Sequence, residues 1–238
     1  MKKVLLPLFL TSTLPSVAIA EVVIYGKANV SVHNADKADN SQLEVVSNAS
    51  RVGVKGGEEI SSGLKAIYQF EYQTEVDDGS GGNNQTFGQR NIYVGLQGSA
   101  GTIMGGKFDT PTKTAQEKID LFNDMEGDFA YLVKGETRAN NIVQYVTPAS
   151  MGNFAVNLAV VAAEAGVDPQ GNEIDADDGV SASVTYTTPS FYLGLAAEQD
   201  ATAQGMDIAR LAARYTLGAL QLGGLYEQSS LNDLDNDA

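Results

Sequence analysis

Alternating apolar and polar residues constrain the fold of this chain more than any other feature of its sequence. The pattern is clearest in two segments, 64–72 and 180–186. In the first, with Ile67 as the exception, apolar residues share one face and polar residues the other: Leu64, Ala66, Tyr68, Phe70 and Tyr72 against Lys65, Gln69 and Glu71. Successive side chains of a strand point to opposite faces, so the pattern predicts strands with one apolar and one polar face.

Eleven segments are predicted to be strands, and helical periodicity is almost absent. They lie near residues 22–32, 48–56, 64–73, 89–96, 102–107, 139–146, 154–163, 180–187, 191–199, 207–216 and 220–228. The links between them alternate in length: short ones at 57–63, 97–101, 147–153, 188–190 and 217–219, and longer polar ones at 33–47, 73–88, 108–138, 164–179 and 200–206. Short turns on one side and long loops on the other are typical of an outer-membrane β-barrel.

The polar faces of several strands carry charge. Arg51 and Lys55 oppose Val52 and Val54, Lys27 opposes Val30 and Val32, and Arg210 and Arg214 oppose Leu211, Ala213 and Tyr215. Charge on this parity suits a water-filled lumen better than the solvent-exposed face of a soluble sheet. Tyrosines recur on the apolar parity, as in the aromatic girdles of membrane barrels: Tyr68, Tyr72, Tyr145, Tyr186, Tyr215 and Tyr226.

Residues 1–20 are predicted to be a cleaved signal peptide. Lys2 and Lys3 precede a short apolar run, and Ala18-Ile-Ala20 forms a small-x-small cleavage site before Glu21. The run is too short to span a bilayer. Export to an outer membrane, with residues 21–238 forming one barrel domain, is therefore expected.

Composition excludes several classes of function. The formal net charge is −15, and removal of Lys2 and Lys3 makes it −17. Nucleic-acid binding requires a basic patch, and none is present. The chain has no cysteine, which excludes thiol chemistry and cysteine metal sites. After residue 20 no run of 18 apolar residues occurs, so a membrane would have to be crossed by a closed barrel.

No catalytic or metal site is predicted, and no cofactor. His33 is the only histidine, too few for a catalytic triad or a histidine metal site. The acidic run 168–179 departs from the calcium-loop pattern, because counting from Asp175 its glycine falls at position five instead of six and Tyr186 occupies the position of the glutamate. An exported adhesin or other β-rich binding protein would explain export and acidity, but not the alternating link lengths.

Seven segments in series resemble the general diffusion porins of Gram-negative outer membranes. They are Tyr25-Gly-Lys27, Ser50-Arg-Val-Gly-Val-Lys-Gly56, Gly63-Leu-Lys-Ala66, Arg90-Asn-Ile-Tyr-Val-Gly-Leu96, Gly105-Gly-Lys-Phe-Asp109, the stretch 120–131 and the stretch 138–145. The resemblance implies an all-β, antiparallel transmembrane barrel of sixteen strands, about eleven of them in this chain. It also implies a homotrimer in contact with outer-membrane lipid and lipopolysaccharide, through which ions and small hydrophilic solutes diffuse passively.

The resemblance further implies a constriction made by the third long loop, residues 108–138, which folds into the pore. By matching position, the basic wall would be Arg51, Arg90 and Arg138, with Lys27 as a weaker member. The acids of the loop would be Asp120 and Asp124, with Asp128 nearby. Thr114 followed by Glu117 predicts a capping box at the start of a short helix in this loop. The net charge predicts a modest preference for cations.

The count of eleven strands is odd, whereas bacterial single-chain barrels have even counts. The segment 229–238 is acidic and polar, where family members end in an amphipathic strand closing on phenylalanine. We therefore expect a C-terminally truncated sequence, with a non-functional fragment as the alternative to a porin.

Overall fold

The computed structural model describes residues 21–37, 40–78, 87–163, 166–167, 173–174 and 178–232. The proposed signal peptide, most of the link 164–179 and the last six residues lie outside this part of the chain. Among the described residues, no helix is long and apolar enough to cross a bilayer.

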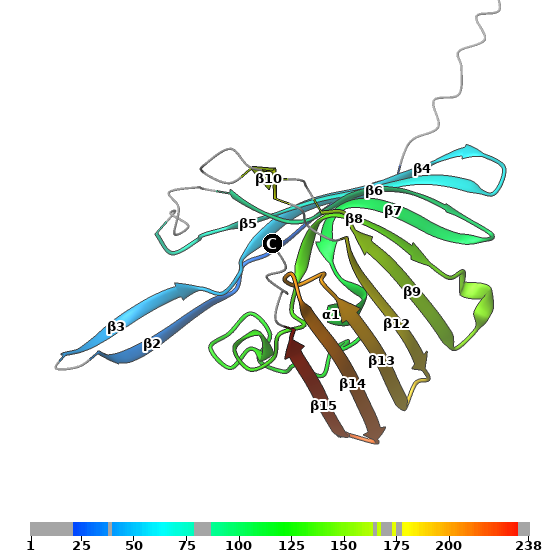
Figure 1. Cartoon of the computed structure of the whole chain (residues 1–238). Coiled ribbons are helices and arrows are strands. Elements are labelled where there is room, and N and C mark those ends of the chain that lie inside the picture. Colours follow the sequence, from blue (N-terminus) through cyan, green and yellow to red (C-terminus); the bar gives the residue numbers. More distant parts are fainter. Residues whose placement is uncertain are drawn as a thin grey trace, which may run out of the picture.

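Eleven strands form one antiparallel sheet, as the alternation predicted. In spatial order they are β1 (Glu21–Lys27), β4 (Arg51–Ser61), β5 (Leu64–Thr74), β6 (Phe87–Gly98), β7 (Gly101–Asp109), β8 (Arg138–Val146), β9 (Phe154–Val161), β12 (Gly179–Thr187), β13 (Phe191–Gln199), β14 (Met206–Leu217) and β15 (Leu220–Leu231). Each strand pairs with its neighbours in chain order, so β1 and β15 are the two edge strands. The sheet curves into a wall around the segment between β7 and β8 (Figure 1).

The first long link differs from the expectation. The predicted strand 22–32 divides into β1 and β2 (Val30–Lys37), and β2 pairs with β3 (Asn40–Ser47) in a separate hairpin that projects from the wall (Figure 1). The buried Ser50 hydroxyl explains the division, because it accepts from Asn29 N at 3.0 Å and donates to Asn29 O at 3.2 Å. These bonds hold the base of the hairpin together where the chain leaves the main sheet. The region expected to be a loop is thus largely β-structure.

The remaining elements are short. In the link between β9 and β12, β10 (Gly166–Val167) pairs with β11 (Glu173–Ile174). One turn of helix, α1 (Pro111–Thr114), and the 3₁₀ turn η1 (Phe129–Tyr131) lie between β7 and β8, and η2 (Ala149–Met151) lies between β8 and β9.

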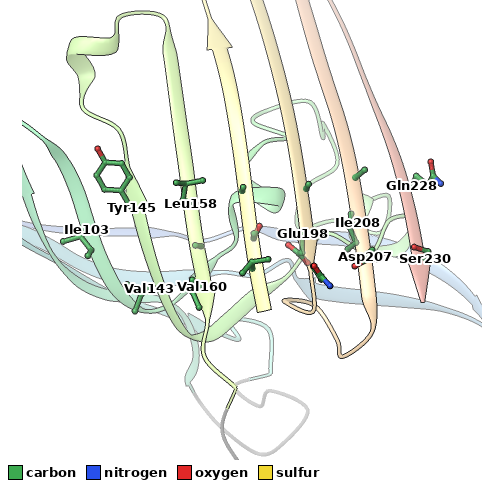
Figure 2. A pocket seen from close by; sticks show the side chains of 17 residues that line it. Ile103, Val143, Tyr145, Leu158, Val160, Glu198, Asp207, Ile208, Gln228 and Ser230 are labelled. Atoms are coloured by element: carbon green, nitrogen blue, oxygen red, sulfur yellow. The ribbon is translucent and has the colours of Figure 1, made fainter. Parts of the chain in front are cut away.

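The burial pattern of the sheet is the reverse of a soluble sandwich. Polar residues on the inner face are buried: Glu71, Gln144, Ser181, Ser183, Glu198 and Arg210. Large apolar residues on the opposite parity are exposed, among them Val94, Ile103, Val143, Leu158, Val184, Leu195, Leu211 and Tyr226. Figure 2 shows part of this outer surface, with Val143, Leu158 and Val160 on neighbouring strands. An apolar exterior around a polar interior is expected of a barrel in lipid, and it disfavours a soluble adhesin.

Two small apolar clusters lie inside the wall. Phe108, Ala139, Ile142 and Ala159 form the first, and Ile119, Tyr192 and Ala212 form the second. Ile119 belongs to the link between β7 and β8, whereas Tyr192 and Ala212 belong to β13 and β14. The second cluster therefore packs this link against the inner face of the sheet.

Candidate functional site

The segment 110–137 leaves β7 and returns to β8 across the inner face of the sheet, and it is called the pore loop after the expectation that it constricts a pore. Its two ends meet where Thr110 N donates to Thr137 O at 3.2 Å. The Thr110 hydroxyl accepts from Lys113 N at 3.3 Å, and Pro111 occupies the first turn of α1. Thr112 N then donates to Ser181 Oγ of β12 at 3.1 Å. These contacts fold the loop inward.

The predicted capping box at Thr114 and Glu117 was wrong. α1 ends at Thr114 instead of beginning there, because Thr110 caps it and Pro111 provides the preorganised first turn. Glu117 has a φ of 52°, outside the helical region. Its carboxylate contacts the Arg214 guanidinium of β14 at 2.6 Å.

Two of the three predicted loop acids bind the backbone of the loop. The Asp120 carboxylate accepts from Phe122 N at 2.9 Å and from Phe129 N at 3.0 Å. The Asp128 carboxylate accepts from Asp124 N and Ala130 N, both at 2.7 Å. These bonds support a tight turn in which Asp124 has a φ of 69°. Asp120 and Asp128 therefore shape the loop, and their closest polar partners are not the wall arginines.

Asp124 is the predicted loop acid that meets the basic wall. Its carboxylate lies 2.7 Å from Arg51 Nη2, 3.0 Å from Lys27 Nζ and 3.8 Å from Arg90 Nη2. Burial raises the pKa of Asp124, but the hydrogen bond from Lys27 and the charges of Arg51, Lys27 and Arg90 outweigh it and leave the pKa below its ordinary value. The ionised carboxylate thus stabilises the loop at neutral pH. That stabilisation is lost only as the pH falls through the lowered pKa.

Further polar groups hydrogen-bond to the basic side chains of the wall and hold them in place. Arg90 Nε donates to Glu71 Oε1 at 2.9 Å, and the Tyr25 hydroxyl donates to Glu71 Oε2 at 2.9 Å. Arg138 lies apart from the loop acids, with Asp109 at 3.0 Å and Asn91 Oδ1 at 2.9 Å as its partners. The structure brings Lys27, Arg51 and Arg90 together around Asp124 and places Arg138 beside them along the wall.

A cavity of about 570 Å³ lies between the pore loop and this wall, beside the contacts of Asp124. Seven carboxylates and five basic side chains line it, including every predicted site residue except Lys27. The sequence-based prediction of the site missed six charged residues of this lining: Glu71, Asp109, Lys113, Glu117, Lys118 and Glu136. The sequence did contain a signal for two of them. Glu71 lies on the polar face of the segment 64–72, and Asp109 ends the segment 105–109, one of the segments that carry the resemblance. The described residues contain no group of histidine and carboxylate side chains arranged to hold a metal ion.

Substitution of Asp120 by asparagine is expected to loosen the loop. One carboxylate oxygen becomes an NH₂ group, which cannot accept the bond from Phe122 N or from Phe129 N, so one donor loses its partner. In the channel that the resemblance implies, we expect greater open-channel current noise, with a smaller change of ion selectivity than substitution of Asp124 causes, because Asp120 lacks direct contact with the wall arginines. Single-channel recording checks this. A larger selectivity change at Asp120 than at Asp124 would contradict it.

Comparison with known proteins supports the same architecture. A family model described as Gram-negative porin matches residues 8–238. The major outer membrane protein P.IB of Neisseria sicca is 32% identical over 147 residues, covering 58% of this chain and 40% of that protein. That of Neisseria gonorrhoeae is 33% identical over 131 residues, covering 51% of this chain and 36% of that protein. The matched region thus spans about two fifths of these relatives.

Solved structures give the same result at the level of the fold. The anion-selective porin from Comamonas acidovorans superposes with a TM-score of 0.72 at 26% identity, covering 88% of this chain and 68% of that one. Salmonella typhi OmpF superposes with a TM-score of 0.64 at 18% identity, covering 88% of this chain and 66% of that one.

Proposed function

The chain belongs to the Gram-negative porin family, and we propose that the complete protein forms a water-filled channel for passive diffusion of ions and small hydrophilic solutes. It is an outer-membrane protein and not an enzyme. We further propose that residues 1–20 are its signal peptide, that residues 21–238 belong to one barrel domain and that the segment 108–138 constricts the pore. A homotrimer, with its outer surface against lipid and lipopolysaccharide, completes the proposal.

The observation that carries this function is the charged cavity inside an inverted sheet. At the edge of this cavity Asp124 of the pore loop pairs with Lys27, Arg51 and Arg90, acidic and basic side chains line the rest of it, and the exterior of the same wall is apolar. Opposed charges along a narrow aqueous path create a transverse field. Polar solutes orient in such a field, whereas apolar solutes must disrupt the ordered water. The constriction would therefore admit small hydrophilic solutes in preference to apolar ones.

We propose a modest cation preference. Seven carboxylates against five basic side chains line the cavity, and the whole chain carries a formal charge of −15. The solved relative from Comamonas acidovorans is named as anion-selective, but it is only 26% identical. The charges of this chain therefore set the sign of the proposed selectivity. Rings of charge without a tight filter give a bias and not strict selection.

Planar-bilayer recording of the full-length protein tests both parts of the proposal. We expect stepwise conductance increments. In a potassium chloride gradient, we expect a reversal potential whose sign indicates that potassium permeates more readily than chloride. Absence of steps from folded protein would refute the channel. Steps with an anionic reversal potential would retain the channel and refute the cation preference. Mass measurement in mild detergent separately tests the homotrimer.

A further inference from the structure

A buried arginine outside the predicted constriction ties the pore loop to the far end of the sheet. Arg210 of β14 has a fully buried side chain between Glu136 of the pore loop and Glu227 of β15. Its Nη1 lies 2.7 Å from Glu136 Oε1, and its Nη2 lies 2.6 Å from Glu227 Oε2. Arg210 Nη1 also donates to Thr112 O at 3.2 Å. One guanidinium therefore contacts the start of the loop, its end and a neighbouring strand.

Glu227 extends the same cluster to the backbone of the loop. Its Oε1 accepts from Lys134 N at 2.6 Å and from Gly135 N at 3.2 Å. A Cβ at Gly135 would lie 2.7 Å from Arg210 Nη2 and 2.9 Å from Glu227 Oε2. Only glycine lets the backbone approach both charged groups this closely. The end of the loop is thus shaped to meet the Arg210–Glu227 pair.

The pore loop reaches both ends of the sheet. Asp124 contacts basic residues of β1, β4 and β6, whereas the Arg210 cluster belongs to β14 and β15. These two groups of strands lie at opposite ends of the strand order. The position of Asp124 against the wall therefore depends on where the other side of the loop is held.

We propose that Arg210, Glu227 and Glu136 form a latch that positions the pore loop and thereby sets the width and charge of the constriction. This inference rests on the proposed channel function. Buried ion pairs contribute little net stability compared with apolar packing, but removal of one partner is costly. Each of these charged groups makes several directional hydrogen bonds, and together these bonds fix the position of the loop more closely than apolar contacts would. The three side chains are positioning residues, because their contacts lie within the protein.

The two carboxylates of the latch have different roles. Glu227 Oε2 accepts from Arg210 Nε at 2.9 Å and from Arg210 Nη2 at 2.6 Å, whereas its Oε1 accepts from the backbone of Lys134 and Gly135. Burial raises the pKa of Glu136, although the charge of Arg210 and its hydrogen bond oppose the rise. Glu136 Oε2 lies 2.9 Å from Gln116 Nε2, and Gln116 Oε1 is buried without a hydrogen-bond partner in the described structure. Rotation of that amide would present an acceptor to a protonated Glu136.

Substitutions should therefore rank by the role of each group. Glu136→Gln retains an acceptor for Arg210 and gains a donor for Gln116 Oε1, so we expect the smallest effect. Arg210→Gln leaves Glu227 without its guanidinium, and Glu227→Gln removes one of the two carboxylates that hold Arg210 and leaves Glu136. For these two we expect conductance to rise by about twofold, with more open-channel noise and a reversal potential nearer zero. Lys65→Gln, which removes one charge from a partly exposed ion pair with Glu21, is the matched control.

A chemical readout reports the position of the loop directly. The chain has no cysteine, so a single reporter can be introduced without background. Ile119 lies on the pore loop, is 7% exposed and packs against Tyr192 and Ala212. With Ile119→Cys as reporter, Arg210→Gln should accelerate modification by a charged thiol reagent, whereas Lys65→Gln should leave the rate at that of the reporter alone. An effect on stability without displacement of the loop would leave modification and conductance unchanged.

The outcomes separate the latch from the channel function. If the wild-type protein forms no channel, the proposed function fails. If the wild-type protein conducts and folded Arg210→Gln and Glu227→Gln match it in conductance, reversal potential and reporter modification, only the latch is refuted. If both variants fail to fold, Arg210→Lys decides, because it retains the charge and loses the forked donor geometry. Altered conductance in Arg210→Lys supports the latch, and wild-type behaviour overturns it.

Discussion

Asp124→Asn is expected to shift the reversal potential toward the anion side and to raise conductance. The substitution removes the loop charge that lies within 3.8 Å of Lys27, Arg51 and Arg90. Those cations then lose the carboxylate that opposes them, although Glu71 still pairs with Arg90. Asp124 is partly buried, where water screens charges less than at the surface. Removal of its charge therefore changes the local electrostatic potential more than removal of an exposed charge would. We expect the cation-to-anion permeability ratio to fall by roughly twofold or more.

The matched control is Asp207→Asn. Asp207 shares its parity with Leu211 on the outer face of β14. The variant therefore removes the same charge at a position that does not line the cavity between the pore loop and the wall. Reversal potentials of both variants, measured in the same potassium chloride gradient, give the comparison. Equal values for Asp124→Asn and the wild type would show that the pore loop does not line the ion path. A shift in both variants would assign selectivity to the net charge of the protein.

The contact of Asp124 with Lys27, Arg51 and Arg90 should persist until the pH is strongly acidic. The pKa of Asp124 lies below its ordinary value, so its carboxylate remains ionised until the pH falls below the usual range for aspartate. If the contact is lost at milder acidity, protonation of a different carboxylate must be the cause. Burial raises the pKa of Glu136, so we expect Glu136 to be protonated before Asp124.

The strands could be predicted from the sequence because lipid outside and water inside force a period of two on each strand. This constraint also placed Lys27 and Arg51 on the inner parity, together with Arg210 and Arg214. The hairpin of β2 and β3 escaped prediction, because Val30 and Val32 continue the alternation of β1 across the point where Ser50 redirects the chain. Alternation reports a strand but not the sheet to which it belongs.

The loop acids show a different limit. Asp120, Asp124 and Asp128 have the same chemistry and similar spacing, yet only Asp124 turns toward the wall. Their orientations follow from which backbone N–H groups the tight turns leave unpaired, and Asp120 and Asp128 satisfy those groups. Likewise, the pairing of Arg210 with Glu136 and Glu227 joins residues far apart in sequence. Parity along a strand carries no information about such partners.

Gly106→Ala is expected to be the most damaging small substitution in the wall. Gly106 of β7 has a φ of 152°, and an added Cβ would lie 2.2 Å from Ile92 O and 2.9 Å from Tyr93 Cα. Both are backbone atoms of the paired strand β6, so no side chain can move aside. The irregular register between Gly106 and Phe108 also sets the residues that follow, including Asp109 opposite Arg138. We expect a loss of about 3 kcal/mol in the free energy of unfolding.

The adjacent Gly105 provides the control for this effect. A Cβ at Gly105 would lie 3.8 Å from Ile142 O and 3.9 Å from Val143 Cγ2, which are ordinary contacts. Gly105→Ala should therefore change the free energy of unfolding by no more than about 0.5 kcal/mol. The chain has ten tyrosines and no tryptophan, so tyrosine fluorescence in urea can follow unfolding of the refolded protein in detergent. Similar unfolding midpoints for the two variants would mean that β6 and β7 can separate to admit a methyl group, and the close approach at Gly106 would then not determine the register that aligns Asp109 with Arg138.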